Sequence, residues 1–191
     1  GDAFGLLCVR PAKEGGLSKL VSSVAIFKEI ERLRPDLASE LQENFYFDTR
    51  AQNPNESKFQ SVPVFIKHDG LVSALYKRQY IETAQRFSEV PKLTVKQIEA
   101  LNMVDTLCNN EEFCFDIKLR PGDMEVANNA TTFHSRENYQ DYDDIKKRRC
   151  MFRLWLSLYD GRPLPDAYEN TREWAPTFQR RNKMKGNTKA V

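Results

Sequence analysis

The sequence has only two histidines, the side chains used most often for metal binding and for acid–base chemistry near neutral pH. His68 precedes Asp69-Gly70, the strongest hairpin signal in the chain, so we expect it to be exposed to solvent and inert. His134 follows residues 131–133, at the end of an expected strand. It is either a hydrogen-bonded strand histidine or a metal ligand, and the arginines that follow it favour the ligand.

Arg149 and Arg153 lie four residues apart, so on a strand they point to the same face (153 − 149 = 4). Arg153 sits within the apolar stretch 151–156, where a buried guanidinium is costly unless it meets an anion. Two arginines directed into one core indicate carboxylate recognition, because the planar guanidinium can bind both carboxylate oxygens. The alternative is a structural arginine paired with a core Asp or Glu, and the residues alone do not separate the two.

Short strands and helices alternate along the chain and would position these residues. Strands are expected over residues 5–10, 44–50, 63–67, 71–77, 113–119, 124–127, 131–135 and 150–158. Helical spacing of apolar residues predicts helices that begin near Ser18, Pro35, Arg78 and Thr94, with Gln97 completing a capping box at the last. Hairpin connections favour an antiparallel sandwich or barrel with helical insertions, a mostly β, α+β fold.

The composition predicts a globular protein without a nucleic-acid or membrane partner. The 191 residues suffice for one domain or most of one, and 40% of them are hydrophobic, which supports a buried core. A net charge of +2 with interspersed signs argues against a dedicated nucleic-acid binder. Only the basic end favours that function, through Arg180, Arg181, Lys183 and Lys185. No apolar run approaches the ~20 residues of a membrane span.

The cysteines sit singly, without metal-binding spacing. We therefore expect reduced thiols in a cytoplasmic protein. They are Cys8, Cys108, Cys114 and Cys150.

Several stretches together resemble one family of oxygenases. Residues 121–136 read PGDMEVANNATTFHSR and residues 148–156 read RRCMFRLWL. Both are similar to the C-terminal signature of taurine dioxygenase-like (TauD/TfdA) and clavaminate synthase-like oxygenases. Residues 6–16, LLCVRPAKEGG, and 63–65, PVF, resemble earlier landmarks of one branch. The resemblance covers essentially residues 1–165.

The resemblance implies a fold, two cofactors and several roles. The family fold is a double-stranded β-helix, or jelly roll, with iron(II) held by two histidines and one carboxylate and with 2-oxoglutarate as co-substrate. His134 is then an iron ligand, and Arg149 grips the remote carboxylate of 2-oxoglutarate. Arg153 faces an anionic group of the primary substrate. Ser18 falls near the hydroxyl residue that helps to hold 2-oxoglutarate, although family members usually have Thr there.

One part of the family pattern is missing from the sequence. The family needs an HxD or HxE pair upstream of Gly15-Gly16, and these residues contain none. We expect the pair to precede Gly1 in a longer protein, so that this chain is an N-terminally truncated jelly roll, inactive alone. Asp2 is the carboxylate ligand only if a histidine directly precedes Gly1. Residues 1–165 would form the partial oxygenase domain and residues 166–191 an irregular, basic tail.

The sequence supports two functional hypotheses. The first is a dioxygenase that oxidises a small, anionic substrate, most simply by hydroxylation, with release of succinate and CO2. The second is a non-catalytic binding or scaffold domain that kept the jelly roll and lost the metal. The sequence leaves homo-oligomerisation and the identity of the substrate open.

Overall fold

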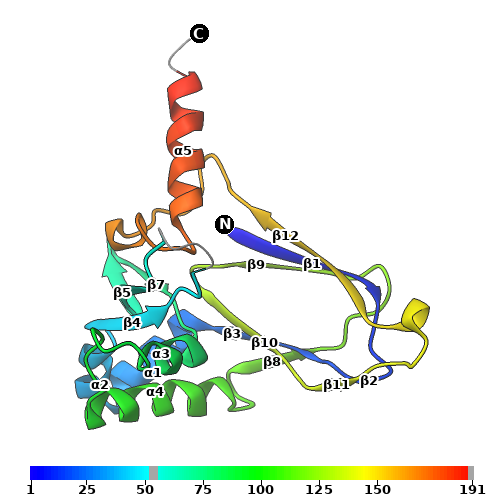
Figure 1. Ribbon diagram of the computed structural model, residues 1–191, viewed down its shortest axis with the longest axis horizontal. Coiled ribbons are helices and arrows are strands. Elements are labelled where there is room, and N and C mark those ends of the chain that lie inside the picture. The colour runs from blue at the N-terminus through cyan, green and yellow to red at the C-terminus, as the bar shows by residue number, and fades with distance from the viewer. Residues whose placement is uncertain (52–55, 189–191) are drawn as a thin grey trace.

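Two three-stranded antiparallel sheets face each other in the computed structural model, which describes residues 1–51 and 56–188 (Figure 1). The first sheet has the order β12 (Cys150–Leu156), β1 (Ala3–Arg10) and β9 (Met124–Asn128). The second has the order β10 (Thr132–Arg136), β3 (Ser18–Ser22) and β8 (Cys114–Ile117). This is the antiparallel sandwich with helical insertions that the sequence predicts.

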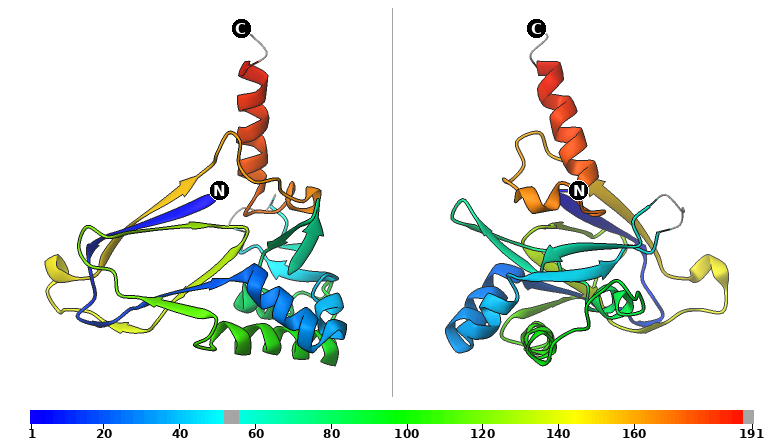
Figure 2. Two further views of the ribbon diagram at one scale, coloured as in Figure 1. Left: turned by 180° about the vertical axis from the view of Figure 1, so that it is seen from behind. Right: turned by 60° about the vertical axis from the view of Figure 1, so that its left-hand side comes forward.

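Smaller elements complete the fold (Figures 1 and 2). Three two-stranded ladders are formed by β11 (Tyr139–Gln140) with β2 (Glu14–Gly15), β4 (Asn44–Asp48) with β5 (Phe59–Pro63), and β6 (Phe65–His68) with β7 (Leu71–Ala74). The α-helices are α1 (Ser23–Leu33), α2 (Pro35–Glu40), α3 (Arg78–Ala84), α4 (Val95–Cys108) and α5 (Ala175–Thr188). Short 3-10 turns are η1 (Ile145–Lys147) and η2 (Asp166–Tyr168). None of the helices in the described part of the chain is long and apolar enough to cross a membrane.

The expected helix start near Ser18 is wrong, because residues 18–22 form the central strand of the second sheet. Ser18 pairs with Arg136 on one side and with Ile117 on the other. The helix begins only after Ser22, whose hydroxyl accepts a hydrogen bond of 3.2 Å from the Ala25 N–H and caps it. The apolar residues of the strand continue the spacing of those in the following helix, so the two elements together resembled one longer helix.

The hairpin prediction is confirmed, but the expected exposure of His68 is not. Asp69 and Gly70 have φ of 48° and 73°, the left-handed conformation that a tight hairpin turn requires. His68 is half-buried, and its Nε2 lies 2.9 Å from the Ser73 hydroxyl across the hairpin. Burial lowers the pKa of His68.

The main hydrophobic cluster lies on the side of the second sheet that the helices cover, and not between the two sheets. It joins α1, α2 and α4 to the β4–β5 and β6–β7 ladders. Its fully buried aromatic side chains include Phe27, Phe45, Phe47, Phe65 and Trp174. The space between the sheets is therefore not filled by this cluster.

The expected irregular conformation of residues 166–191 is wrong over the described residues. The segment forms η2 and the long helix α5, which projects from the body in Figure 1. Tyr168 and Trp174 are 0% and 1% exposed and stack with ring centroids 5.6 Å apart. Both rings belong to the main hydrophobic cluster, so this segment packs against the rest of the chain. Residues 189–191 lie outside the described residues.

Candidate functional site

Two adjoining cavities contain most of the predicted site residues. The smaller, of about 460 Å³, is lined by residues from both sheets, namely Leu6, Ser18, Glu125, His134, Ser135, Arg136, Arg149, Met151 and Arg153. The larger, of about 850 Å³, shares His134, Ser135 and Arg153 with it and extends toward α3, α4 and the C-terminal segment. His134 and Arg153 therefore stand at the junction of the two cavities.

Strand register explains why these side chains meet. Leu6 of β1 is paired with Arg153 of β12 on one side and with Glu125 of β9 on the other, so the three share one face of the first sheet. On the second sheet Ser18 is paired with Arg136, and His134 lies two residues before Arg136 on the same face. The inner faces of the two sheets thus supply opposite walls of the smaller cavity.

His134 has the environment of a neutral imidazole rather than of a hydrogen-bonded strand histidine. Its ring lies against Phe4, with centroids 4.0 Å apart, and makes no hydrogen bond to the residues that the structure describes. Burial, with the positive charges of Arg153 and Lys77, lowers the pKa of His134 to about 4. The ring is therefore unprotonated at neutral pH, which is the form that binds a metal.

Both predicted arginines line the smaller cavity, and neither forms an ion pair within the described part of the chain. The Arg149 guanidinium lies 5.5 Å from the centre of the Tyr139 ring. The backbone N–H of Arg149, not its side chain, donates to Asp141 Oδ1 at 2.7 Å. Arg153 is exposed, with its guanidinium 5.8 Å from the Trp155 ring, so the expectation that it is buried is wrong. The alternative of arginines paired with a core carboxylate does not describe these contacts.

Ser18 reaches the same cavity, whereas Asp2 does not. Ser18 is 4% exposed and stands on the wall opposite the first sheet. Asp2 lines neither cavity, and both of its carboxylate oxygens already have partners. Oδ2 accepts from the Leu158 N–H at 2.8 Å, and Oδ1 binds the Arg181 guanidinium. The hypothesis that Asp2 is an iron ligand is therefore not supported, because its carboxylate anchors the C-terminal segment instead.

Glu125 is a site residue that sequence reasoning missed. Its side chain lines the smaller cavity, the residue is 5% exposed, and Oε2 has no hydrogen-bond partner among the described residues. The sequence analysis predicted a strand here but not which face of it is buried. The neighbouring apolar residues Met124 and Val126 point outward and are 59% and 55% exposed.

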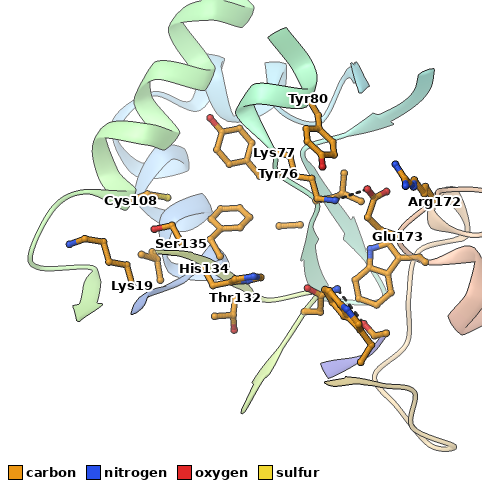
Figure 3. A pocket seen from close by; sticks show the side chains of 18 of the residues that line it. Lys19, Tyr76, Lys77, Tyr80, Cys108, Thr132, His134, Ser135, Arg172 and Glu173 are labelled. Carbon is orange, nitrogen blue, oxygen red and sulfur yellow. Dashed lines mark hydrogen bonds and ion pairs between the residues drawn. The ribbon is translucent and has the colours of Figure 1, made fainter. Parts of the chain in front are cut away.

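The larger cavity brings in further polar residues that carried no sequence signal (Figure 3). Lys77 forms an ion pair of 2.8 Å with Glu173, and the Tyr76 hydroxyl donates to Asp105 at 2.6 Å. Figure 3 shows His134 and Lys77 on facing sides of this space. These residues come from segments far apart in the sequence, so only the fold reveals that they are neighbours.

The residues present fit the co-substrate better than they fit a complete iron site. A hydroxyl and a guanidinium, from Ser18 and Arg149, can together bind a carboxylate in the smaller cavity. Within the described residues no group of three or more His, Cys, Asp or Glu side chains is arranged to hold a metal ion. His134 supplies one candidate ligand of the three that a facial triad needs.

The two sheets thus enclose a cavity lined by an unprotonated histidine and by two arginines that have no ion-pair partner among the described residues. The model of the family "Taurine catabolism dioxygenase TauD, TfdA family" matches residues 1–155. The chain therefore belongs to this family of Fe(II)- and 2-oxoglutarate-dependent oxygenases, and the resemblance identified from the sequence is confirmed.

Individual relatives agree with this assignment. FR-33289 synthase of Streptomyces rubellomurinus is 28% identical over 91% of this chain and 52% of its own length. A uridine-5'-phosphate dioxygenase of a Streptomyces species is 25% identical over 83% of this chain and 56% of its own. Asparagine oxygenase, solved with Fe(II), hydroxyasparagine and succinate, superposes with a TM-score of 0.59 and 15% identity over 80% of this chain and 44% of that one. The last match confirms the jelly-roll fold, and the chain spans about half the length of these relatives.

Proposed function

We propose that this chain is part of a dioxygenase that couples decarboxylation of 2-oxoglutarate to oxidation of a small substrate, most simply its hydroxylation. The products from 2-oxoglutarate would be succinate and CO2. The observation that carries the proposal is that Ser18, His134, Arg149 and Arg153 line one cavity between the two sheets. Family membership over residues 1–155 and the free cysteines support an oxygenase that works in the cytoplasm.

Each residue has a distinct role in this proposal. His134 is an iron ligand, because its imidazole is unprotonated and has no competing hydrogen bond from the described residues. Arg149 and Ser18 bind the carboxylate of 2-oxoglutarate remote from the iron. Arg153, at the junction with the larger cavity, faces an anionic group of the primary substrate. The name of the uridine-5'-phosphate dioxygenase is consistent with an anionic substrate in a relative.

The iron site would be completed by residues outside this sequence. When bound, iron supplies the activation of oxygen, and the protein supplies orientation and charge. Among the described residues His134 is the one candidate ligand that we assign, so we expect the chain to be inactive alone. Turnover then requires a longer protein that adds a histidine and a carboxylate.

A non-catalytic scaffold is the second candidate, and the lack of a complete ligand set among the described residues favours it. The two candidates differ in what happens to 2-oxoglutarate. A scaffold leaves it intact in the longer protein, whereas a dioxygenase converts it to succinate.

The experiment uses the longer protein and follows succinate release with iron(II) and 2-oxoglutarate. His134→Ala should abolish succinate release, whereas His68→Ala, the same change at the only other histidine, should leave it near the wild-type rate. Wild-type protein that releases no succinate under these conditions would favour the scaffold. Retained activity in His134→Ala would remove His134 from the iron site.

A second measurement separates the two arginines. Arg149→Lys should raise the Michaelis constant for 2-oxoglutarate about 10- to 150-fold, because lysine cannot replace a bidentate charge-assisted contact. Arg153→Lys should mainly affect the primary substrate. Equal effects of both changes on both substrates would assign the arginines to folding instead.

A further inference from the structure

The segment that follows β12 forms one wall of the larger cavity, although it lies beyond the family match, which ends at residue 155. Its cavity-lining residues are Arg172, Glu173, Trp174, Pro176 and Arg180. Figure 3 shows Arg172 and Glu173 on the far side of the cavity from His134. Because this wall lies outside the residues that the family model matches, its side chains can differ between family members and so select different substrates.

A hydrogen-bonded network holds the start of this wall in place. Glu173 accepts from Lys77 at 2.8 Å and from the Gln60 amide at 2.7 Å, and Gln60 in turn accepts from the Arg172 N–H at 2.8 Å. Although burial alone raises the pKa of Glu173, the contacts with Lys77 and Gln60 lower it, so the carboxylate stays ionised. The stacked rings of Trp174 and Tyr168 anchor the same stretch in the core.

The other end of the wall is also fixed. The Arg181 guanidinium binds the buried Asp2 carboxylate and donates to the Arg162 carbonyl at 3.0 Å. Anchors at Glu173 and Arg181 therefore bracket the stretch that lines the cavity. A wall held at both ends can present its side chains to a ligand in a constant position.

The cavity has an excess of positive charge. Its lining has cationic side chains at Lys19, Lys77, Arg153, Arg172 and Arg180 against acidic ones at Asp105 and Glu173. Lys19 forms an ion pair with Asp116 and Lys77 with Glu173, and Asp105 is bound by Tyr76 and Arg78, so the excess lies with the arginines of the lining.

The two arginines of the wall have no carboxylate partner in the part of the chain that the structure describes. Arg180 donates to the Ser157 hydroxyl at 3.3 Å, and Arg172 donates to the Thr49 carbonyl. Arg153 lines the smaller cavity as well, together with His134, whereas Arg172 and Arg180 line only the larger one, so the positive charge extends from the junction of the two cavities to the C-terminal wall.

We propose that residues 157–181 are the specificity element of this cavity, and that Arg172 and Arg180 bind a second anionic group of the primary substrate. The inference rests on the proposed function and deepens it. The substrate is then an elongated molecule with two anionic groups, one at Arg153 near the iron ligand and one at the C-terminal wall. A phosphorylated acid or a phosphonocarboxylate has this chemistry.

Binding can be measured without iron, because both tryptophans of the chain, Trp155 and Trp174, line the cavity. The protein, at saturating 2-oxoglutarate, is titrated with methylphosphonate, which has one anionic group, or with 3-phosphonopropionate, which has two. The tryptophan fluorescence reports the binding of each ligand. We expect 3-phosphonopropionate to bind more tightly. Arg172→Gln or Arg180→Gln should each weaken it about tenfold, the loss of one charge-assisted contact, and leave methylphosphonate binding unchanged. Arg153→Gln should weaken both ligands.

Matched variants control for folding and for general charge. Arg32→Gln makes the same change on α1, where Arg32 pairs with Glu29 away from the cavity, and should alter neither titration. Arg180→Lys keeps the charge and should retain most of the affinity for 3-phosphonopropionate. Equal wild-type affinity for the two phosphonates, or losses in Arg172→Gln and Arg180→Gln no larger than in Arg32→Gln, would overturn the inference.

The proposed function is tested separately in the same assay. If Arg149→Lys leaves the affinity for 2-oxoglutarate unchanged while the phosphonates bind as expected, the inference about the wall is retained and the proposed co-substrate site is wrong. If Arg149→Lys weakens 2-oxoglutarate binding but the wall variants bind the phosphonates as wild type does, only the inference about residues 157–181 is wrong.

Discussion

At the scale of single residues, position in the fold decides what each polar side chain can do. His134 and His68 are both half-buried, yet only His134 faces a cavity without a hydrogen-bond partner among the described residues. Glu125 carries a buried carboxylate oxygen in the same cavity as Arg149 and Arg153. Such a group is costly to leave unpaired, and its presence among arginines marks a site rather than a core.

The lowered pKa of His134 predicts a specific pH dependence of stability. The folded pKa of about 4 lies below the ordinary value of 6.5, so between these values the unfolded chain binds the proton more tightly. The contribution of His134 to the free energy of unfolding is therefore complete above pH 6.5 and is lost as the pH falls toward 4.

Denaturant unfolding at several pH values measures this contribution. The stability difference between wild type and His134→Gln should shrink as the pH falls from 6.5 to 4. The matched change His68→Gln should show a smaller dependence, because His68 is the less perturbed of the two histidines. Proton NMR of the two imidazoles gives an independent reading, and a His134 midpoint near 6.5 would contradict the buried environment.

At the scale of elements, sequence patterns were reliable where local chemistry defines a boundary. The Asp69-Gly70 turn and the Thr94 cap both have the predicted conformation, because a left-handed turn and an N-terminal hydrogen bond depend on neighbouring residues alone. The patterns failed where long-range pairing decides. Ser18 lies on a strand because β10 and β8 pair with it on both sides, and Glu125 points inward because of its register with Leu6.

The same distinction applies to the candidate site. Family resemblance predicted which residues would meet, and His134, Arg149, Arg153 and Ser18 do line one cavity. The C-terminal wall was not predicted, because it depends on long-range contacts. Glu173 and Lys77 lie almost a hundred positions apart in the sequence, and the buried rings pack in the main hydrophobic cluster. The basic composition of that stretch was interpreted as an irregular tail, whereas packing by Trp174 makes it part of the core.

The capping box of α4 gives a quantitative test of an element boundary. The Gln97 N–H donates to the Thr94 hydroxyl at 3.1 Å, and the Thr94 N–H donates to the Gln97 side chain at 3.1 Å. Thr94→Ala removes the first bond and should lower the free energy of unfolding by about 1 kcal/mol.

Thr106→Ala is the matched control on the same helix. Thr106 is exposed, and its hydroxyl only donates back to the Asn102 carbonyl at 2.9 Å, so alanine should leave stability equal or slightly higher. Urea denaturation compares the two variants. A loss in Thr106→Ala as large as that in Thr94→Ala would mean that the box does not fix the start of α4.

At the scale of the whole molecule, the two sheets are unequally covered. The main hydrophobic cluster supports the second sheet from the side of the helices, whereas the first sheet exposes apolar side chains on its outer face. Phe152 and Leu154 of β12 are 59% and 50% exposed, and Val126 of β9 is 55% exposed. The sequence predicted a buried strand here from composition, which does not specify whether a second layer is present.

The described residues hold no complete ligand set for iron, which predicts that the chain binds divalent metal ions only weakly. One imidazole binds iron(II) or cobalt(II) too weakly to compete with water, because a facial triad depends on three ligands held together. Cys108 does not add a thiolate at neutral pH, since burial raises its pKa to about 12. Anaerobic calorimetric titration of the chain with cobalt(II) at pH 7 should therefore reveal no stoichiometric micromolar site. His134→Ala should give the same trace as wild type. A stoichiometric micromolar site that His134→Ala removes would mean that this chain completes the iron site by itself, and the proposal that a longer protein supplies the other ligands would be wrong.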